Sequence, residues 1–106
     1  MTHRVELSAR AAGDVREAYA WIRMHGPADP DAWRAGLEAK LGSLEMFPEG
    51  CGLAAENEFV AIELRQTFYG GYRIVFTVRG VTVHVVTIRH GARLPLSRRD
   101  LDFDLS

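Results

Sequence analysis

The segment from Tyr72 to His90 constrains the fold of this chain more than any other. From position 72 to 78 the sequence reads YRIVFTV, in which large apolar residues alternate with other residues, as in a strand. Arg79-Gly80 supplies a two-residue connection of the kind used in tight hairpins. The β-branched stretch from Val81 to His90 then returns as a second strand. The segment therefore predicts a β-hairpin, which needs another layer to cover its apolar face.

Alternation along this hairpin assigns its side chains to two faces. The residues expected to face the helices are Ile74, Phe76 and Val78, and those expected on the opposite, more open face are Arg73, Val75 and Thr77. The returning strand is apolar in both phases, over positions 81–85 and again over 86–88. Its second face must therefore also be covered, and in a chain with only two helices another chain is a candidate cover.

A short strand and a first helix are predicted at the start of the chain. Val5 and Leu7 alternate with polar neighbours, as in a strand. Ser8 then offers a side-chain oxygen to cap a helix whose apolar residues recur every three or four positions. This helix is expected to stop near His25, because Gly26-Pro27 follows.

A second helix begins at Asp29-Pro30, with aspartate as the cap and proline at the first helical position. We expect it to end around Met46 or Phe47, because Pro48 and several glycines follow. Two amphipathic helices joined by about four residues form an antiparallel hairpin that must bury its apolar stripe.

A further strand is predicted over Phe59–Gln66, with Val60, Ile62 and Leu64 on one face and Gly70-Gly71 after it. The order of elements is then β-α-α-β-β-β. This order predicts an α+β fold, with a helical hairpin packed on one face of a mostly antiparallel four-stranded sheet. Residues 1–106 are expected to form one domain, with 94–106 as a flexible tail.

Charge is segregated along the chain, although the net charge is only −1. Residues 1–63 carry eleven acidic and six basic side chains. Residues 64–99 carry no acidic side chain and seven arginines, at positions 65, 73, 79, 89, 93, 98 and 99. Such segregation favours a surface for an anionic partner. The alternative is that some of these arginines, Arg73 among them, pair with acidic residues of the helices.

Several motifs resemble the RelE/ParE toxins of bacterial type II toxin–antitoxin systems. The resemblance covers roughly residues 4–93, and its motifs are LSARAAGDVREAYAWI, LEMFPEG, ELRQTFYGGYRIVFTV and VTVHVVTIRHGAR. A strand of the form Tyr-Arg-Ile-x-Phe, followed by a β-branched strand ending in His-Gly-x-Arg, is characteristic of the ParE-like branch.

The resemblance implies a toxin that is neutralised by an antitoxin encoded beside it. ParE-like members are associated with inhibition of DNA gyrase, and in them the helical hairpin and the C-terminal region are implicated in target contact. RelE-like members cut messenger RNA in the ribosomal A site. A toxin relic that retains only antitoxin binding is a third alternative.

For the nuclease alternative, the resemblance places Arg73 at a catalytic position and His90 where some relatives carry a catalytic histidine. Glu63 would serve as the base. Three further arginines, Arg65, Arg89 and Arg93, would bind phosphates.

The chain departs from the nuclease pattern in three ways. Ala61 and Glu63 stand where RelE-like nucleases place lysines, and no tyrosine follows Tyr72. The net charge is slightly negative, whereas binding to ribosomal RNA favours a strongly basic protein. These departures favour the gyrase-directed function over RNA cleavage.

A two-sided apolar strand beside arginines suits an antitoxin segment that folds on binding. Acidic residues of that segment are expected to meet Arg65, Arg73, Arg89, His90 or Arg93. We predict no cofactor and no metal site, because the histidines lack ligand spacing and Cys51 is the only cysteine. With acidic residues near the N-terminus and no long apolar run, the chain is expected to be cytoplasmic and without a membrane partner.

Overall fold

The computed structural model describes residues 2–26, 28–59 and 62–90. Its main elements, in chain order, are β1 (Arg4–Leu7), α1 (Ala9–His25), α2 (Pro30–Ser43), β2 (Arg65–Tyr69), β3 (Tyr72–Arg79) and β4 (Thr82–His90). Two short 3-10 helices, η1 (Pro48–Gly50) and η2 (Ala55–Phe59), lie between α2 and β2.

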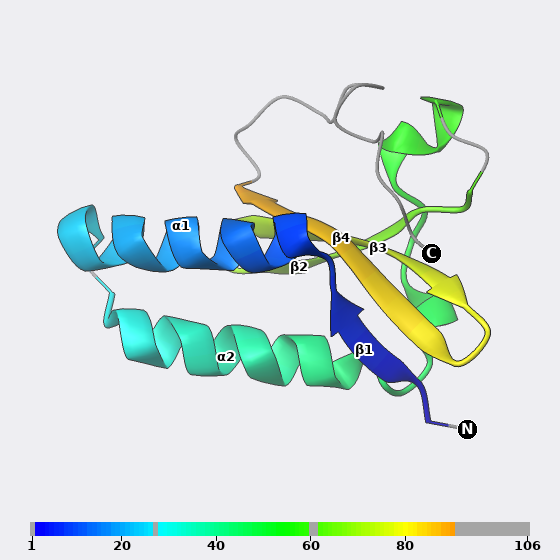
Figure 1. Ribbon diagram of the computed structural model, residues 1–106, viewed down its shortest axis with the longest axis horizontal. Coiled ribbons are helices and arrows are strands. Elements are labelled where there is room, and N and C mark those ends of the chain that lie inside the picture. The colour runs from blue at the N-terminus through cyan, green and yellow to red at the C-terminus, as the bar shows by residue number, and fades with distance from the viewer. Residues whose placement is uncertain (1, 27, 60–61, 91–106) are drawn as a thin grey trace.

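The strands form one sheet in the order β1-β4-β3-β2, in which β1 runs parallel to β4 and the other pairs are antiparallel. The two helices run side by side as a hairpin next to the sheet (Figure 1). The predicted α+β class, the order β-α-α-β-β-β and the mostly antiparallel four-stranded sheet are confirmed.

Capping residues determine where the two helices begin. The Ser8 side chain accepts a hydrogen bond from the amide of Ala11 at 2.9 Å, and the Asp29 carboxylate accepts one from the amide of Asp31 at 3.0 Å. These bonds satisfy amide groups that the first turn of a helix leaves without an internal partner. Both predicted helix starts are confirmed.

The end of α2 lies earlier than predicted. The helix stops at Ser43 instead of near Met46, and a turn leads into η1. Phe47 takes a left-handed backbone conformation with φ of 53°, which an α-helix cannot contain.

The strand predicted over Phe59–Gln66 is wrong, because β2 occupies Arg65–Tyr69. The residues before it form a loop that is closed by the Asn57 side chain. Its amide donates to the carbonyls of Ala54 at 2.7 Å and Leu64 at 2.6 Å, and its oxygen accepts from the Leu64 amide at 2.8 Å. Of the alternating apolar residues before Arg65, Leu64 and Ile62 therefore belong to a cap over the sheet, and Val60 lies outside the described residues.

The hairpin between β3 and β4 is confirmed, but its turn lies one residue later than predicted. Arg79 pairs with Thr82, so the connection is Gly80-Val81. Gly80 has φ of 60°, a conformation that tight two-residue turns require and that glycine adopts without a steric penalty.

The main core lies between the helices and one face of the sheet. Ile74 and Phe76 are fully buried there, and Val78 packs against the same cluster, as predicted. Burying each such side chain contributes roughly 1.5–3 kcal/mol.

The opposite face of the sheet is covered as well, so the expectation that it is open is wrong. Val75 and Thr77 are 0% and 4% exposed. Val75 belongs to a second buried cluster with Ala54, Leu64 and Val86. The cover for Val75 and Val86 is thus this chain's own segment between α2 and β2, and no second chain is needed for it.

A β-bulge explains why β4 is apolar in both phases. Val75 pairs with Thr87, whereas the next residue, Phe76, pairs with Val85, so Val86 is the extra residue. The bulge turns Val86 toward the second cluster and returns Ile88 to the main core.

A hydrogen bond between the two helices provides a test of their packing. The Tyr19 hydroxyl donates to Asp31 Oδ1 at 2.7 Å. This bond, followed by partial desolvation and the charge of Asp31, raises the pKa of Tyr19 above its ordinary value of 10.0. The stability that the bond contributes is present below pH 10 and is lost as the pH rises through the raised pKa.

We expect Tyr19 to ionise at a higher pH in the wild-type chain than in the Asp31→Asn variant. The tyrosinate absorbance of each protein, less that of the matching Tyr19→Phe variant, isolates this one phenol. Equal midpoints in the two proteins would contradict the hydrogen bond.

Candidate functional site

Arg73 on β3 forms a largely buried ion pair with Glu56. Its Nη1 donates to Glu56 Oε1 at 2.7 Å and to Gln66 Oε1 at 3.0 Å, and its Nη2 donates to Glu56 Oε2. The Glu56 side chain is 0% exposed and that of Arg73 is 14% exposed. The hydrogen bond to Glu56 raises the pKa of Arg73, so the guanidinium stays charged at every ordinary pH. Two parallel bonds between a guanidinium and a carboxylate fix both groups.

The loop before β2 holds Glu56 in this position. Glu56 and Asn57 are neighbours on η2, and the three hydrogen bonds of Asn57 hold that short helix over the sheet. Glu56 therefore faces the side of β3 that carries Arg73. The acidic partner expected for Arg73 exists, but it comes from η2 and not from α1 or α2.

Arg65 and Glu63 form a second, more exposed pair. Arg65 Nη2 lies 2.9 Å from Glu63 Oε1, and its Nη1 donates to the carbonyl of Cys51 at 2.5 Å. The Glu63 side chain is 61% exposed. The carboxylate proposed as a base is thus at the surface, next to Arg65.

The register of the sheet places Arg73 and His90 on opposite faces. His90 pairs with Tyr72, and Arg89 pairs with Arg73. Because successive side chains of a strand point to opposite faces of the sheet, the first pair lies on one face and the second pair on the other. The His90 ring meets the Tyr72 ring edge-on at 5.4 Å, with an interplanar angle of 83°. The sheet therefore brings Arg73 and Arg89 together and separates them from His90.

Two other predicted site residues lie elsewhere. Arg65 pairs with Phe76 and so lies on the helix side of the sheet. Arg93 lies outside the described residues. The arginines of the segment are thus divided between two faces, and their roles in binding or catalysis stay predictions.

Asp14 on α1 has a structural role that the sequence analysis missed. Its Oδ2 accepts hydrogen bonds from Thr87 Oγ1 at 2.5 Å and from the amide of Ile88 at 3.0 Å. β1 pairs with β4 only as far as Val85, so the carboxylate continues the bonding beyond the end of β1. The signal was available: Asp14 interrupts an otherwise apolar helical stripe, three residues after the buried Ala11.

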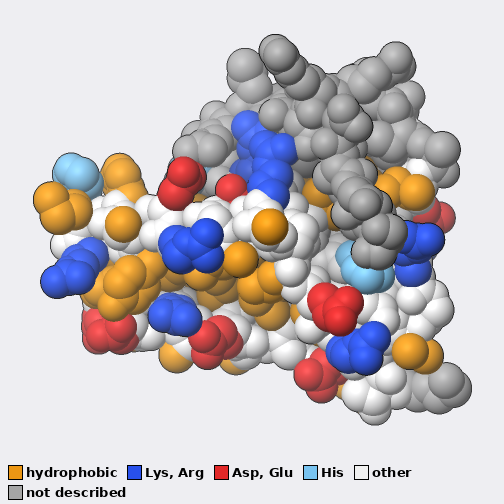
Figure 2. Space-filling view, viewed as in Figure 1, with side chains coloured by type: hydrophobic (Ala, Val, Ile, Leu, Met, Phe, Trp, Pro, Cys, Tyr) orange, Lys and Arg blue, Asp and Glu red, His pale blue; other side chains and the backbone are white. Residues whose placement is uncertain are grey.

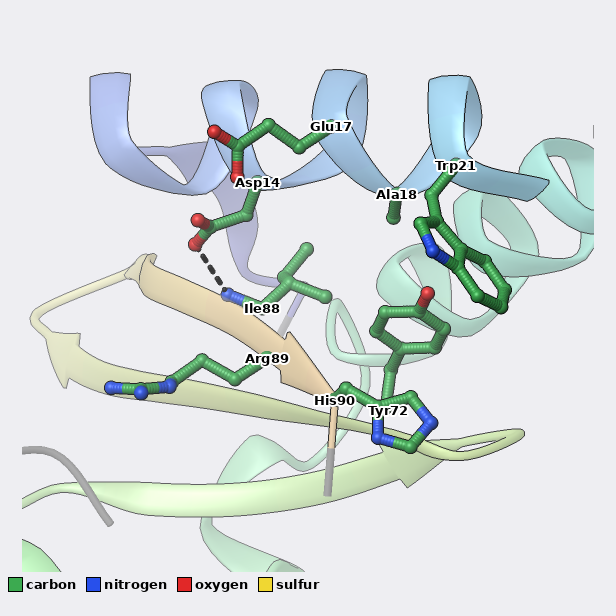
Figure 3. A pocket seen from close by; sticks show the side chains of 8 residues that line it. All are labelled: Asp14, Glu17, Ala18, Trp21, Tyr72, Ile88, Arg89 and His90. Carbon is green, nitrogen blue, oxygen red and sulfur yellow. Dashed lines mark hydrogen bonds between the residues drawn. The ribbon is translucent and has the colours of Figure 1, made fainter. Parts of the chain in front are cut away.

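A cleft of about 530 Å³ opens between α1 and the end of β4 (Figure 3). The residues that line it are Asp14, Glu17, Ala18, Trp21, Tyr72, Ile88, Arg89 and His90. Trp21 is 57% exposed, although it was assigned to the core or to the helical hairpin contacts. Exposed tryptophan beside a cleft is typical of binding surfaces.

A second hollow, of about 410 Å³, lies along the helical hairpin, and its lining includes Val15, Tyr19 and Arg34. Figure 2 shows hydrophobic side chains exposed along this hairpin, with charged side chains of both signs beside them. In the described part of the chain, no helix is long and apolar enough to span a bilayer, and no group of three or more acidic, histidine or cysteine side chains is arranged to hold a metal ion.

The element order and the sheet order of this chain are shared with solved structures of the ParDE system and of toxin RelE, so the fold is of that type. A family model described as "ParE toxin of type II toxin-antitoxin system, parDE" matches residues 5–95, and the chain belongs to that family. The resemblance seen in the sequence is thereby confirmed. No curated protein matches the chain with significance.

Solved structures share the fold at low sequence identity. The chromosomal ParDE toxin–antitoxin system of P. aeruginosa matches with a TM-score of 0.66 and 17% identity, over 84% of this chain and 96% of that one. The RelBE2 toxin–antitoxin complex of Mycobacterium tuberculosis matches with a TM-score of 0.58 and 18% identity, over 85% of this chain and 99% of that one. A mutant of E. coli toxin RelE in the free state matches with a TM-score of 0.56 and 20% identity, over 87% of this chain and 86% of that one.

Proposed function

We propose that this ParE-family toxin arrests growth by binding and inhibiting DNA gyrase, and that a cognate antitoxin neutralises it. Membership of the ParE family supports the choice of target, because ParE-like toxins are associated with gyrase inhibition. The observation that carries the proposal is the buried ion pair between Arg73 and Glu56. It supports a toxin that acts by binding and not by RNA cleavage.

RNA cleavage by side chains needs a base, an acid and cations directed at the same phosphate. Arg73 instead points into its own protein, where Glu56 neutralises it. His90 lies on the other face of the sheet, and Glu63 lies beside Arg65. A binding function asks for no such constellation.

The antitoxin is proposed by analogy with the P. aeruginosa and M. tuberculosis structures, which are of toxin–antitoxin systems. We retain the proposal that acidic residues of its segment meet Arg65, Arg89, His90 or Arg93. Arg73 contributes least to such an interface, because its side chain is only 14% exposed and is already paired.

Expression of the chain is expected to cause filamentation and DNA-damage signalling, and the purified protein is expected to block supercoiling by gyrase. Co-expression with the neighbouring small open reading frame should relieve the arrest and yield a stable complex. Rapid arrest of translation with cut messages would overturn the proposal in favour of a nuclease. Absence of any growth effect would leave a toxin relic.

The Glu56→Leu/Arg73→Met double variant is the matched control in the supercoiling assay. It removes both charges of the buried pair together, so it avoids leaving either one alone. We expect the folded double variant to block supercoiling as the wild-type chain does. Loss of inhibition in a folded double variant would contradict a mechanism in which Arg73 has no catalytic role.

A further inference from the structure

The cleft between α1 and β4 has aromatic walls. In Figure 3, the Trp21 indole extends from α1 toward the Tyr72 ring, which rises from β3. The buried residues Ala18 and Ile88 also line the cleft. The Arg89 side chain is directed away from the two aromatic rings in the same view. The flat, apolar part of the cleft is therefore formed by Trp21 and Tyr72.

The α1 side of the cleft is negatively charged. Asp14 and Glu17 lie one helical turn apart, and Glu17 lies one turn before Trp21, so these side chains are neighbours on the helix. Asp14 is engaged by Thr87 and Ile88 of β4. Glu17 is exposed, and within the described ranges its carboxylate takes part in no hydrogen bond or ion pair. An accessible carboxylate thus stands beside an exposed indole.

We propose that this cleft binds an arginine side chain carried by an extended segment of a partner protein. Arginine is the cation whose planar guanidinium stacks on aromatic rings while its N–H groups pair with a carboxylate. Trp21 and Tyr72 supply the rings, and Glu17 supplies the carboxylate. The methylene stem of the arginine packs on Ala18, and an apolar neighbour in the segment packs on Ile88. An acidic side chain at this place is repelled by Asp14 and Glu17.

The site is separate from the proposed gyrase inhibition, because none of its contacts uses the Arg73–Glu56 pair. Arg89 and His90 line this cleft and also belong to the proposed antitoxin contacts, in which they meet acidic residues of a partner, whereas the arginine proposed here contacts Trp21, Tyr72 and Glu17. The two kinds of contact are compatible, because one partner segment can carry acidic residues for the cations of this chain and an arginine for the cleft.

The test uses the capped peptide acetyl-Ala-Leu-Arg-Leu-Ala-amide and the isotopically labelled full chain. The NMR signal of the Trp21 indole N–H is expected to shift as the peptide is added at millimolar concentration. A peptide with citrulline in place of arginine keeps the shape and loses the charge. We expect it to bind roughly tenfold more weakly, because a hydrogen bond between charged groups is lost.

The Glu17→Gln variant is likewise expected to bind the arginine peptide roughly tenfold more weakly. The Trp21→Ala variant is expected to lose binding, which is followed through the backbone amide signal of Ala18 because this variant has no indole at position 21. The control Glu38→Gln removes an exposed carboxylate from α2, which pairs with Arg34, and should leave binding unchanged. Equal binding of the citrulline peptide, of a lysine peptide or of the Glu17→Gln variant would overturn the proposal, as would a shift at Trp33 without one at Trp21. The assay needs no toxic activity, so these results leave the proposed function to its own test.

Discussion

Replacing Glu56 with alanine is expected to lower the free energy of unfolding by about 3–5 kcal/mol. The change leaves the charged Arg73 guanidinium largely buried, without the carboxylate that accepts two of its hydrogen bonds. A domain of this size has a total stability of about 5–15 kcal/mol, so the loss is a large fraction of it. Urea unfolding followed by circular dichroism measures the difference.

Glu63→Ala is the matched control for this change. It removes the same side chain from an ion pair of similar length with Arg65, but Glu63 is 61% exposed. Solvent screens such a pair, so the expected cost is only about 0–1 kcal/mol. The Glu56→Leu/Arg73→Met double variant should recover most of the stability lost in Glu56→Ala. If Glu56→Ala and Glu63→Ala cost the same, the buried pair does not hold the fold as described.

Replacing Gly36 with alanine is expected to destabilise the chain by about 1–3 kcal/mol. Helix propensity alone predicts the opposite, a gain of about 1 kcal/mol. A Cβ at Gly36 would lie 2.1 Å from the hydroxyl oxygen of Tyr69 and 2.9 Å from its Cζ. That hydroxyl donates to the carbonyl of Trp33 at 2.9 Å, so the ring cannot move without breaking the bond.

Gly42→Ala in the same helix is the matched control, because a Cβ there meets nothing within 4 Å. We expect it to be neutral or to stabilise α2 by up to about 1 kcal/mol. Adding Tyr69→Phe to Gly36→Ala removes the closest atom and should restore part of the stability. Thermal unfolding of the four proteins compares them. A gain in stability from both glycine substitutions would show that Tyr69 does not pack against α2 in this way.

The sequence predicted the parts of the fold that depend on neighbouring residues. Helix caps at Ser8 and Asp29 act over two or three positions, so their motifs are visible locally. The motifs shared with RelE/ParE toxins likewise identified the family. The strand predicted over Phe59–Gln66 failed for the opposite reason. Its alternation is real, but pairing with the distant strand β3 begins only at Arg65.

The candidate site was predicted less well than the fold. The pairing of Arg73 with an acidic residue was foreseen as an alternative, yet Glu56 could not be named, because it lies 17 positions earlier in the chain. Trp21 was assigned to the core or to hairpin contacts because its spacing is helical, and only the structure shows the cleft beside it.

By itself the sequence determined the order of the main helices and strands, the helix starts, the hairpin from Tyr72 to His90 and the toxin family, because each rests on local patterns of residues. The tertiary structure alone decided that Glu56 pairs with Arg73, and that the bulge at Val86 directs this valine into the second buried cluster. It also decided that Arg73 and His90 lie on opposite faces of the sheet. These features depend on strand register and on contacts between distant residues. A shift of one residue in register reverses the face of every side chain in a strand, and no local pattern sets it at a bulge.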